Sequence, residues 1–98
     1  MVNRIVFTPT ALRESNNIIA YLRNNAPYQA AEMFLNSVEK HVTQLESNVT
    51  EGRPVPSRKN IRFVRIGKYH RMYYRKQGTT LYVTRFFDTR QDPNKRPY

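Results

Sequence analysis

Hydrophobic positions along this 98-residue chain follow first a strand period, then a helix period, and then a strand period again. Residues 2–8 are rich in β-branched side chains, which predicts a short strand. From Pro9 to about Asn24, and again from about Tyr28 to about Glu46, apolar residues recur every three or four positions, which predicts two amphipathic helices. Their apolar stripes are Ala11, Ile18, Ile19 and Leu22, and then Ala30, Ala31, Phe34, Val38, Val42 and Leu45.

The boundaries of these helices have local signals. Thr8 is a suitable cap and Pro9 suits the first helical position, where its missing N–H has no cost. The segment 25–27 ends the first helix with a proline. Two amphipathic helices joined by so few residues predict an antiparallel hairpin, which needs another element to cover its apolar stripes.

The second half of the chain predicts a three-stranded meander. Residues 47–60 are polar and contain two prolines and a glycine, which is typical of a loop. Three strand-like runs follow, separated by short glycine-containing joints that favour hairpins. The runs are Ile61–Ile66, Tyr69–Arg75 and Thr80–Asp88, and the joints are Gly67-Lys68 and Gln77-Gly78. The tail 91–98 has no apolar pattern and is expected to be irregular. The fold class is therefore α+β: a helical hairpin packed on one face of a small twisted antiparallel sheet, in one domain over residues 1–98.

Two-residue turns at both joints would set the register of these strands. Val64 would lie opposite Arg71, and Tyr73 opposite Tyr82, so alternation divides the sheet into two faces. One face would seat the hairpin, and it holds Ile61, Phe63, Met72, Tyr74, Leu81, Val83 and Phe87, with Arg65, His70 and Arg85 at one end. The other would be exposed, and it holds Arg62, Val64, Ile66, Tyr69, Arg71, Tyr73, Arg75, Tyr82, Thr84, Phe86 and Asp88.

Charge is divided unevenly along the chain, whose net charge is +10. Residues 52–98 have thirteen Lys/Arg and two Asp/Glu, whereas residues 1–51 have four Lys/Arg and five Asp/Glu. Like charges repel, so this imbalance does not help the fold, and it favours a polyanionic or acidic partner for the second half.

Arginines interleaved with aromatic rings on the exposed face have two interpretations. Guanidinium groups neutralise phosphates and rings stack on unpaired bases, so the pattern is typical of a surface for single-stranded nucleic acid. The same residues also fit a solvated outer sheet face, because tyrosine has a high strand propensity. The charge imbalance favours the functional interpretation over the structural one.

Other kinds of chemistry have little support. The chain has no cysteine, which fits a reducing cytoplasm, and its two histidines and seven carboxylates have no metal-ligand spacing, so no metal or cofactor is expected. We expect neither a signal peptide nor a membrane span. His41 is expected near the core boundary, and His70 beside Arg65 and Arg85, which would disfavour its protonation. An enzyme built on this chain would use Arg, Lys and Tyr, which suit phosphoryl chemistry on RNA.

The order of elements and several short motifs resemble the RelE/ParE superfamily, the toxins of bacterial type II toxin–antitoxin pairs. The resemblance covers nearly the whole chain. The residues that carry it are Phe7-Thr8-Pro9 and Ala11; Ala30, Phe34 and Leu45; Glu51-Gly52-Arg53-Pro54; Arg62; Arg65-Ile66-Gly67-Lys68-Tyr69; His70-Arg71-Met72-Tyr73-Tyr74-Arg75; and Arg85-Phe86-Phe87-Asp88-Thr89-Arg90-Gln91-Asp92-Pro93.

This resemblance implies one of two activities. RelE-like members are ribosome-dependent mRNA endoribonucleases that need no metal, and their catalytic positions would be filled here by Arg62, Arg71, Arg90 and Tyr98. ParE-like members inhibit DNA gyrase and need no nuclease site. In either case the residues expected to bind the target or a nucleic acid are Arg62, Arg71, Tyr73, Arg75 and Arg90.

Two departures from the nuclease pattern favour the ParE-like branch. Val64 stands at the second basic position of the first hairpin strand, and Asp88-Thr89 stand where a histidine would follow the last strand. The expectation is a toxin that inhibits gyrase, with the ribosome-dependent RNase as the alternative and a non-toxic basic binding module on the same fold as a further one. All three imply an acidic partner, which for a toxin would be its antitoxin.

Overall fold

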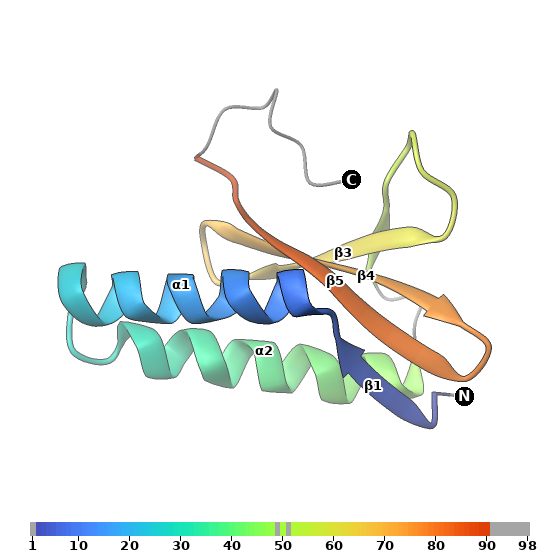
Figure 1. Cartoon of the computed structure of the whole chain (residues 1–98), viewed down its shortest axis with the longest axis horizontal. Helices are drawn as coiled ribbons and strands as arrows, with labels where there is room; N and C mark the ends of the chain where they lie inside the picture. Colours follow the sequence, from blue (N-terminus) through green and yellow to red (C-terminus); the bar gives the residue numbers. More distant parts are fainter. Residues whose placement is uncertain (1, 49, 51, 91–98) are drawn as a thin grey trace.

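The computed structural model, which describes residues 2–48, 50 and 52–90, has two antiparallel helices packed on one face of a five-stranded sheet (Figure 1). The elements are β1 (Arg4–Phe7), α1 (Pro9–Asn25), α2 (Ala30–Ser47), β2 (Arg53–Pro54), β3 (Ile61–Ile66), β4 (His70–Gln77) and β5 (Thr80–Asp88). The strand order is β1-β5-β4-β3-β2, with β1 parallel to β5 and all other pairs antiparallel. The predicted α+β fold is confirmed.

Thr8 caps α1 as predicted and also fastens it to the sheet. Its side-chain oxygen accepts a hydrogen bond from the Ala11 N–H at 3.1 Å, and its hydroxyl donates to the Thr84 carbonyl in β5 at 3.0 Å. α2 begins at Ala30, two residues later than expected, and Tyr28 lies before it with 93% of its surface exposed. The cap of α1 therefore joins the start of this helix directly to β5.

The segment that was expected to be entirely loop contains the short strand β2. Its two residues pair with β3, Arg53 opposite Phe63 and Pro54 opposite Arg62. Proline suits this position because β2 is at the edge of the sheet. Gly52 precedes it and donates its N–H to the Tyr74 hydroxyl at 3.0 Å, and a Cβ at this position would lie only 2.7 Å from the Phe63 carbonyl oxygen.

The predicted register between β3 and β4 is wrong by one residue. Ile66 pairs with His70, so the connection has three residues, 67–69, and begins with Gly67 at a φ of 63°. Val64 therefore lies opposite Met72, not Arg71. Because side chains alternate between faces, a slip of one residue turns every β3 side chain to the opposite face from the one predicted.

The predicted register between β4 and β5 is also wrong, but its error is two residues near the turn. Gln77 pairs with Thr80 and Arg75 with Tyr82, which keeps the predicted faces there. Further along, Tyr74 pairs with Val83 and Tyr73 with Arg85, so β5 has one additional residue, Thr84. This bulge turns Phe86 toward the core, where Phe87 had been expected.

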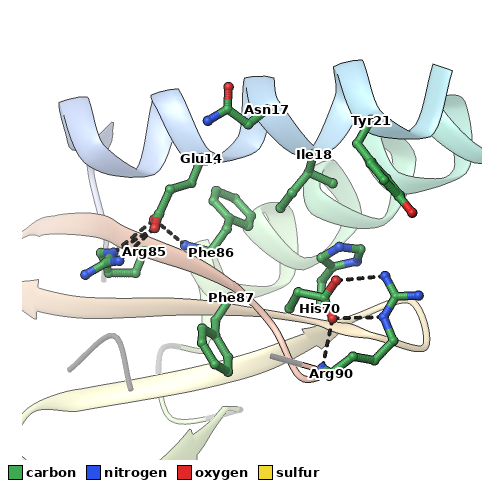
Figure 2. A pocket seen from close by; sticks show the side chains of 10 residues that line it. Glu14, Asn17, Ile18, Tyr21, His70, Arg85, Phe86, Phe87 and Arg90 are labelled. Atoms are coloured by element: carbon green, nitrogen blue, oxygen red, sulfur yellow. Dashed lines mark hydrogen bonds and ion pairs between the residues drawn. The ribbon is translucent and has the colours of Figure 1, made fainter. Parts of the chain in front are cut away.

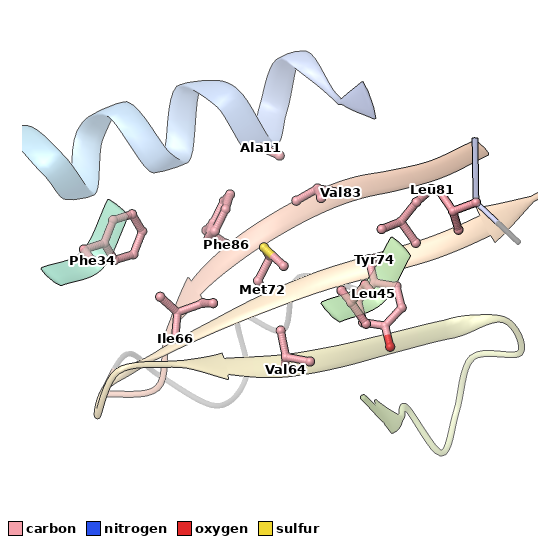
Figure 3. Packing of buried hydrophobic residues seen from close by; sticks show 11 residues of the cluster. Ala11, Phe34, Leu45, Val64, Ile66, Met72, Tyr74, Leu81, Val83 and Phe86 are labelled. Atoms are coloured by element: carbon pink, nitrogen blue, oxygen red, sulfur yellow. The ribbon is translucent and has the colours of Figure 1, made fainter. Parts of the chain in front are cut away.

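The core lies between the helices and the inner face of the sheet, defined here as the face toward α1 and α2 (Figure 3). The sheet contributes Val64, Ile66, Met72, Tyr74, Leu81, Val83 and Phe86, and the helices contribute Ala11, Phe34 and Leu45. Met72, Leu81 and Val83 have no exposed surface. The predicted apolar stripes of both helices therefore cover this face, and the opposite face of the sheet has no described helix on it.

Candidate functional site

The outer face of the sheet, turned away from the helices, carries four arginines in a lattice with aromatic residues. Strand pairing places Arg53 beside Phe63, Arg65 beside Arg71, and Arg75 beside Tyr82. Tyr73 also belongs to this face, because it pairs with Phe63. We call the set Arg53, Arg65, Arg71, Arg75, Phe63, Tyr73 and Tyr82 the basic sheet face.

Two of these arginines lie over aromatic rings of the same face. The guanidinium carbon of Arg71 is 4.4 Å from the centre of the Phe63 ring, and that of Arg75 is 4.6 Å from the centre of the Tyr82 ring. Arg75 also donates to the Gln77 side-chain oxygen at 2.8 Å. Among the described residues, the buried Nε of Arg71 has no hydrogen-bond partner. The rings thus fix both side chains, and no carboxylate of the described ranges forms an ion pair with either.

Arg62 is not on this face, although it was expected there. It pairs with Tyr74 and turns to the inner side of the sheet, since the slip in β3 reverses its orientation. Its Nη1 donates to the Gly52 carbonyl at 2.8 Å and to the Thr50 carbonyl at 3.3 Å. The side chain therefore holds the segment before β2 against the sheet, and Arg65 takes the place on the outer face that Arg62 was expected to occupy.

Tyr73 is on the expected face but is not an exposed ring. Only 2% of its surface is accessible, and its ring centre is 5.6 Å from that of Phe63. Arg71 and Arg75, by contrast, are half-buried, and Arg53 and Arg65 are exposed. The most accessible members of the face are therefore two arginines. Tyr98, the last expected site residue, lies outside the described residues.

Arg90 lies beyond the end of β5 and is paired. Its Nε and Nη2 donate to the two carboxylate oxygens of Asp88 at 3.0 and 2.7 Å, and its guanidinium lies 4.3 Å from the centre of the Tyr69 ring. The hydrogen bonds from Arg90 lower the pKa of the Asp88 carboxyl. Thr89 donates from both its N–H and its hydroxyl to the Tyr69 carbonyl, so the end of β5 is fastened to the β3–β4 connection.

His70 is half-buried, and its ring meets the Phe34 ring edge-on with the ring centres 5.4 Å apart. Burial lowers its pKa, Asp88 opposes this shift, and Arg90 adds to it. The expected direction was right, but the expected neighbours were wrong, because Arg85 is bound to Glu14 and Arg65 is on the outer face. His41 has the boundary position that was expected, with its Nδ1 2.8 Å from the Ser37 carbonyl oxygen.

A groove of about 630 Å³ lies between α1 and the second half of β5 (Figure 2). β1 ends at Phe7, so on this side the second half of β5 has no paired strand, although β4 pairs with it on the other side. Glu14 of α1 reaches the edge, where its carboxylate accepts from the Phe86 N–H at 3.0 Å and from Arg85 at 2.8 to 3.1 Å. Sequence reasoning missed this ion pair because its partners are 71 residues apart and no local signal connects them.

The chemistry available to the described residues is narrow. No group of three or more His, Cys, Asp or Glu side chains in the described ranges is arranged to hold a metal ion. No described helix is both long enough and apolar enough to cross a membrane. What remains is a group of four arginines on one sheet face, two of them held over rings, which is suited to binding an anionic surface.

A comparison with protein-family models matches residues 5–93 to the family described as "ParE toxin of type II toxin-antitoxin system, parDE". A comparison with curated proteins found no matching sequence. Among solved structures, a chain of the chromosomal ParDE toxin–antitoxin system from P. aeruginosa is similar in fold, with a TM-score of 0.72 at 16% identity over 90% of this chain and 96% of that one. A YoeB/ParE toxin from Agrobacterium tumefaciens gives a TM-score of 0.67 at 15% identity over 87% and 96%.

Proposed function

Because the chain belongs to the ParE toxin family of type II toxin–antitoxin systems, we propose that it stops bacterial growth by inhibiting DNA gyrase and cleaves no RNA itself. In this proposal the toxin acts in the cytoplasm, and its antitoxin is an acidic protein that counters the net charge of +10.

The observation that carries the proposal is the separation of Arg62 from Arg71. A nuclease needs its cations to converge on one phosphate, so that they stabilise the charge that develops during cleavage. Arg62 is on the inner side of the sheet and donates to two backbone carbonyls, whereas Arg71 is on the outer face against Phe63. Arg90 is bound to Asp88 beyond the end of β5. The opposite faces of Arg62 and Arg71, and the pairing of Arg90, argue against a common phosphate site.

Within the proposal, the basic sheet face contacts the target. It combines fixed cations with a surface that no described helix covers, and this is the property expected of a docking face for an anionic partner. Arg71 and Arg75 are the residues from the sequence-based set that retain this role. Arg65 and Arg53 are added to this set, whereas Arg62 has a structural role.

Two assays test the proposal. The full chain is added to purified gyrase with relaxed plasmid, and separately to a translation reaction whose mRNA is mapped for cleavage. We expect supercoiling to fall with toxin concentration while the mRNA stays intact. Unchanged supercoiling at an excess of toxin, or codon-dependent cleavage of ribosome-bound mRNA, would contradict the proposal.

A further inference from the structure

Resting on the proposed action on gyrase, whose substrate is DNA, we propose that the basic sheet face binds the phosphate backbone of duplex DNA directly. The toxin would then contact the DNA held by the enzyme, through Arg53, Arg65, Arg71 and Arg75. In the proposed function the basic sheet face is a docking face for an anionic partner; the ligand named here is the DNA backbone.

The first argument is that no described carboxylate is paired with the arginines of this face. In the described part of the chain, the carboxylate–guanidinium ion pairs are Glu14–Arg85 at the groove and Asp88–Arg90 beyond β5. Neither includes an arginine of the basic sheet face. A fold gains nothing from gathering four cations without carboxylate partners on one surface, whereas a polyanion that binds there releases its counterions and gains affinity.

The second argument is the cross-strand pair Arg65–Arg71. These residues are direct register partners on adjacent strands, and their side chains lie on the same face. Like charges in this arrangement destabilise a sheet. Their guanidinium groups have different neighbours, because Arg65 donates to the Lys68 carbonyl at 3.3 Å and Arg71 lies over the Phe63 ring. Phosphates of a nucleic-acid backbone bound at this face would offset the repulsion between the two cations.

The third argument is preorganisation. Arg71 is fixed on Phe63, and Arg75 is fixed on Tyr82 and bonded to Gln77. A free arginine loses side-chain entropy when it binds a phosphate, but these two have already lost it on folding. Their affinity for an anion is correspondingly higher than that of a mobile surface arginine.

The limited accessibility of the aromatic rings on this face favours duplex over single-stranded DNA as the ligand. Binding of single strands relies on bases that stack on accessible rings. Here a guanidinium group lies over each of the partly buried Phe63 and Tyr82 rings, and Tyr73 is buried. The face therefore offers cations for a backbone and few freely accessible rings for unpaired bases, which favours the duplex over the single strand as its ligand.

The test is fluorescence anisotropy with the full chain, a labelled duplex of about two helical turns and the corresponding labelled single strand, at several salt concentrations. The variant R65Q/R71Q/R75Q removes three charges from the basic sheet face. The matched control R13Q/R23Q/K40Q removes three charges from exposed positions on the helices. We expect the face variant to bind the duplex about tenfold more weakly or worse, with a salt slope smaller by roughly one for each phosphate that it no longer neutralises. The control should bind nearly as the natural chain does.

Three results would overturn the inference: equal weakening in both variants, unchanged binding in the face variant, or tighter binding of the single strand than of the duplex. Circular dichroism shows whether each variant folds. Should R71Q unfold the chain, the exposed pair R53Q/R65Q against R13Q/R23Q asks the same question. The gyrase assay remains separate, because DNA binding without inhibition rejects the proposed function, and inhibition that R65Q/R71Q/R75Q leaves intact rejects only the DNA contact.

Discussion

The two faces of the sheet are built from the same strands but meet opposite surroundings. The inner face is apolar and closed by the helices, and Met72, Leu81 and Val83 have no exposed surface. The outer face alternates arginines with aromatic rings and is covered by no described helix. Neighbouring residues of one strand thus have different roles, because alternation places one side chain in the core and the next on the outer face.

The arginines differ between these regions in what they bind. Arg62, on the inner side of the sheet, donates to the Gly52 carbonyl. Arg85, at the edge of β5, donates to the Glu14 carboxylate. Arg71 and Arg75, on the outer face, lie on rings. Guanidinium groups that join distant segments hold the fold together, whereas those resting on a ring remain able to bind an anion. The type of partner therefore separates structural arginines from candidate binding ones better than position in the sequence does.

Truncating the inner face should have the largest effect on stability. Leu81→Ala removes a fully buried side chain from the centre of the core and leaves a cavity, so the free energy of unfolding should fall by about 2–5 kcal/mol. Urea denaturation measures the loss. A loss smaller than about 1 kcal/mol would mean that the two faces differ less in their contribution to stability than their burial indicates.

Gly52→Ala should come next. The new Cβ would lie 2.7 Å from the Phe63 carbonyl and crowd the Tyr74 hydroxyl that accepts from the Gly52 N–H. Displacing these groups should cost about 1–3 kcal/mol of unfolding free energy, measured by the same denaturation. Gly67→Ala is a useful comparison, because a Cβ there meets no atom within 4 Å and its effect would come from its φ of 63° alone. An equal loss in both variants would argue against steric crowding at Gly52.

Glu14→Gln should cost less, about 1 kcal/mol, because the ion pair with Arg85 is partly solvent-exposed and an amide oxygen can still accept from the Phe86 N–H. Thermal unfolding at low and high salt measures it. Salt should narrow the difference between Glu14→Gln and the natural chain, and a difference that salt leaves unchanged would contradict an electrostatic origin.

Acidification should weaken the fold through His70. Because burial holds its pKa in the folded chain below 6.5, the unfolded chain takes up the proton first as pH falls through 6.5. The free energy of unfolding should therefore fall below pH 6.5 and be unaffected by this residue above it. Denaturation about one pH unit above and one below that value measures the change, and His70→Gln should make it smaller. An equal loss in the variant would assign it to other groups.

Arg71→Gln should have the smallest effect on stability, within about 0.5 kcal/mol, because the half-buried side chain lies on the outer face, outside the core, and has no ion pair in the described residues. The toxicity of the Arg71→Gln variant on induced expression should nevertheless be clearly lower than that of the natural chain. Arg13→Gln, on α1, is the control and should remain toxic. Unfolding of the Arg71 variant would instead make this arginine part of the structure.

The fold was largely predictable because its signals are local. The helical periods, the Thr8-Pro9 start and the three strands of the meander each depend on residues near one another in sequence, and all are confirmed. The parallel pairing of β1 with β5 was not predictable in this way, because it joins residues about 76 positions apart, such as Ile5 and Leu81.

The candidate site was predicted less well, because it depends on register. One additional residue in the β3–β4 connection exchanged Arg62 for Arg65 on the outer face, and the bulge at Thr84 exchanged Phe87 for Phe86 in the core. A glycine between two strands indicates a turn, but it does not say whether the turn has two or three residues. Because side chains alternate between the faces of a sheet, one residue more or less in the turn decides on which face each side chain lies.

The sequence by itself determined the elements, their order and the excess of cations in the second half, because propensity, periodicity and charge are properties of short segments. Only the tertiary structure decided which arginines are bound by Glu14 and the Gly52 carbonyl, and which lie on aromatic rings. The physical reason is that a charge acquires its role from neighbours distant in sequence, and those neighbours are set by register and packing.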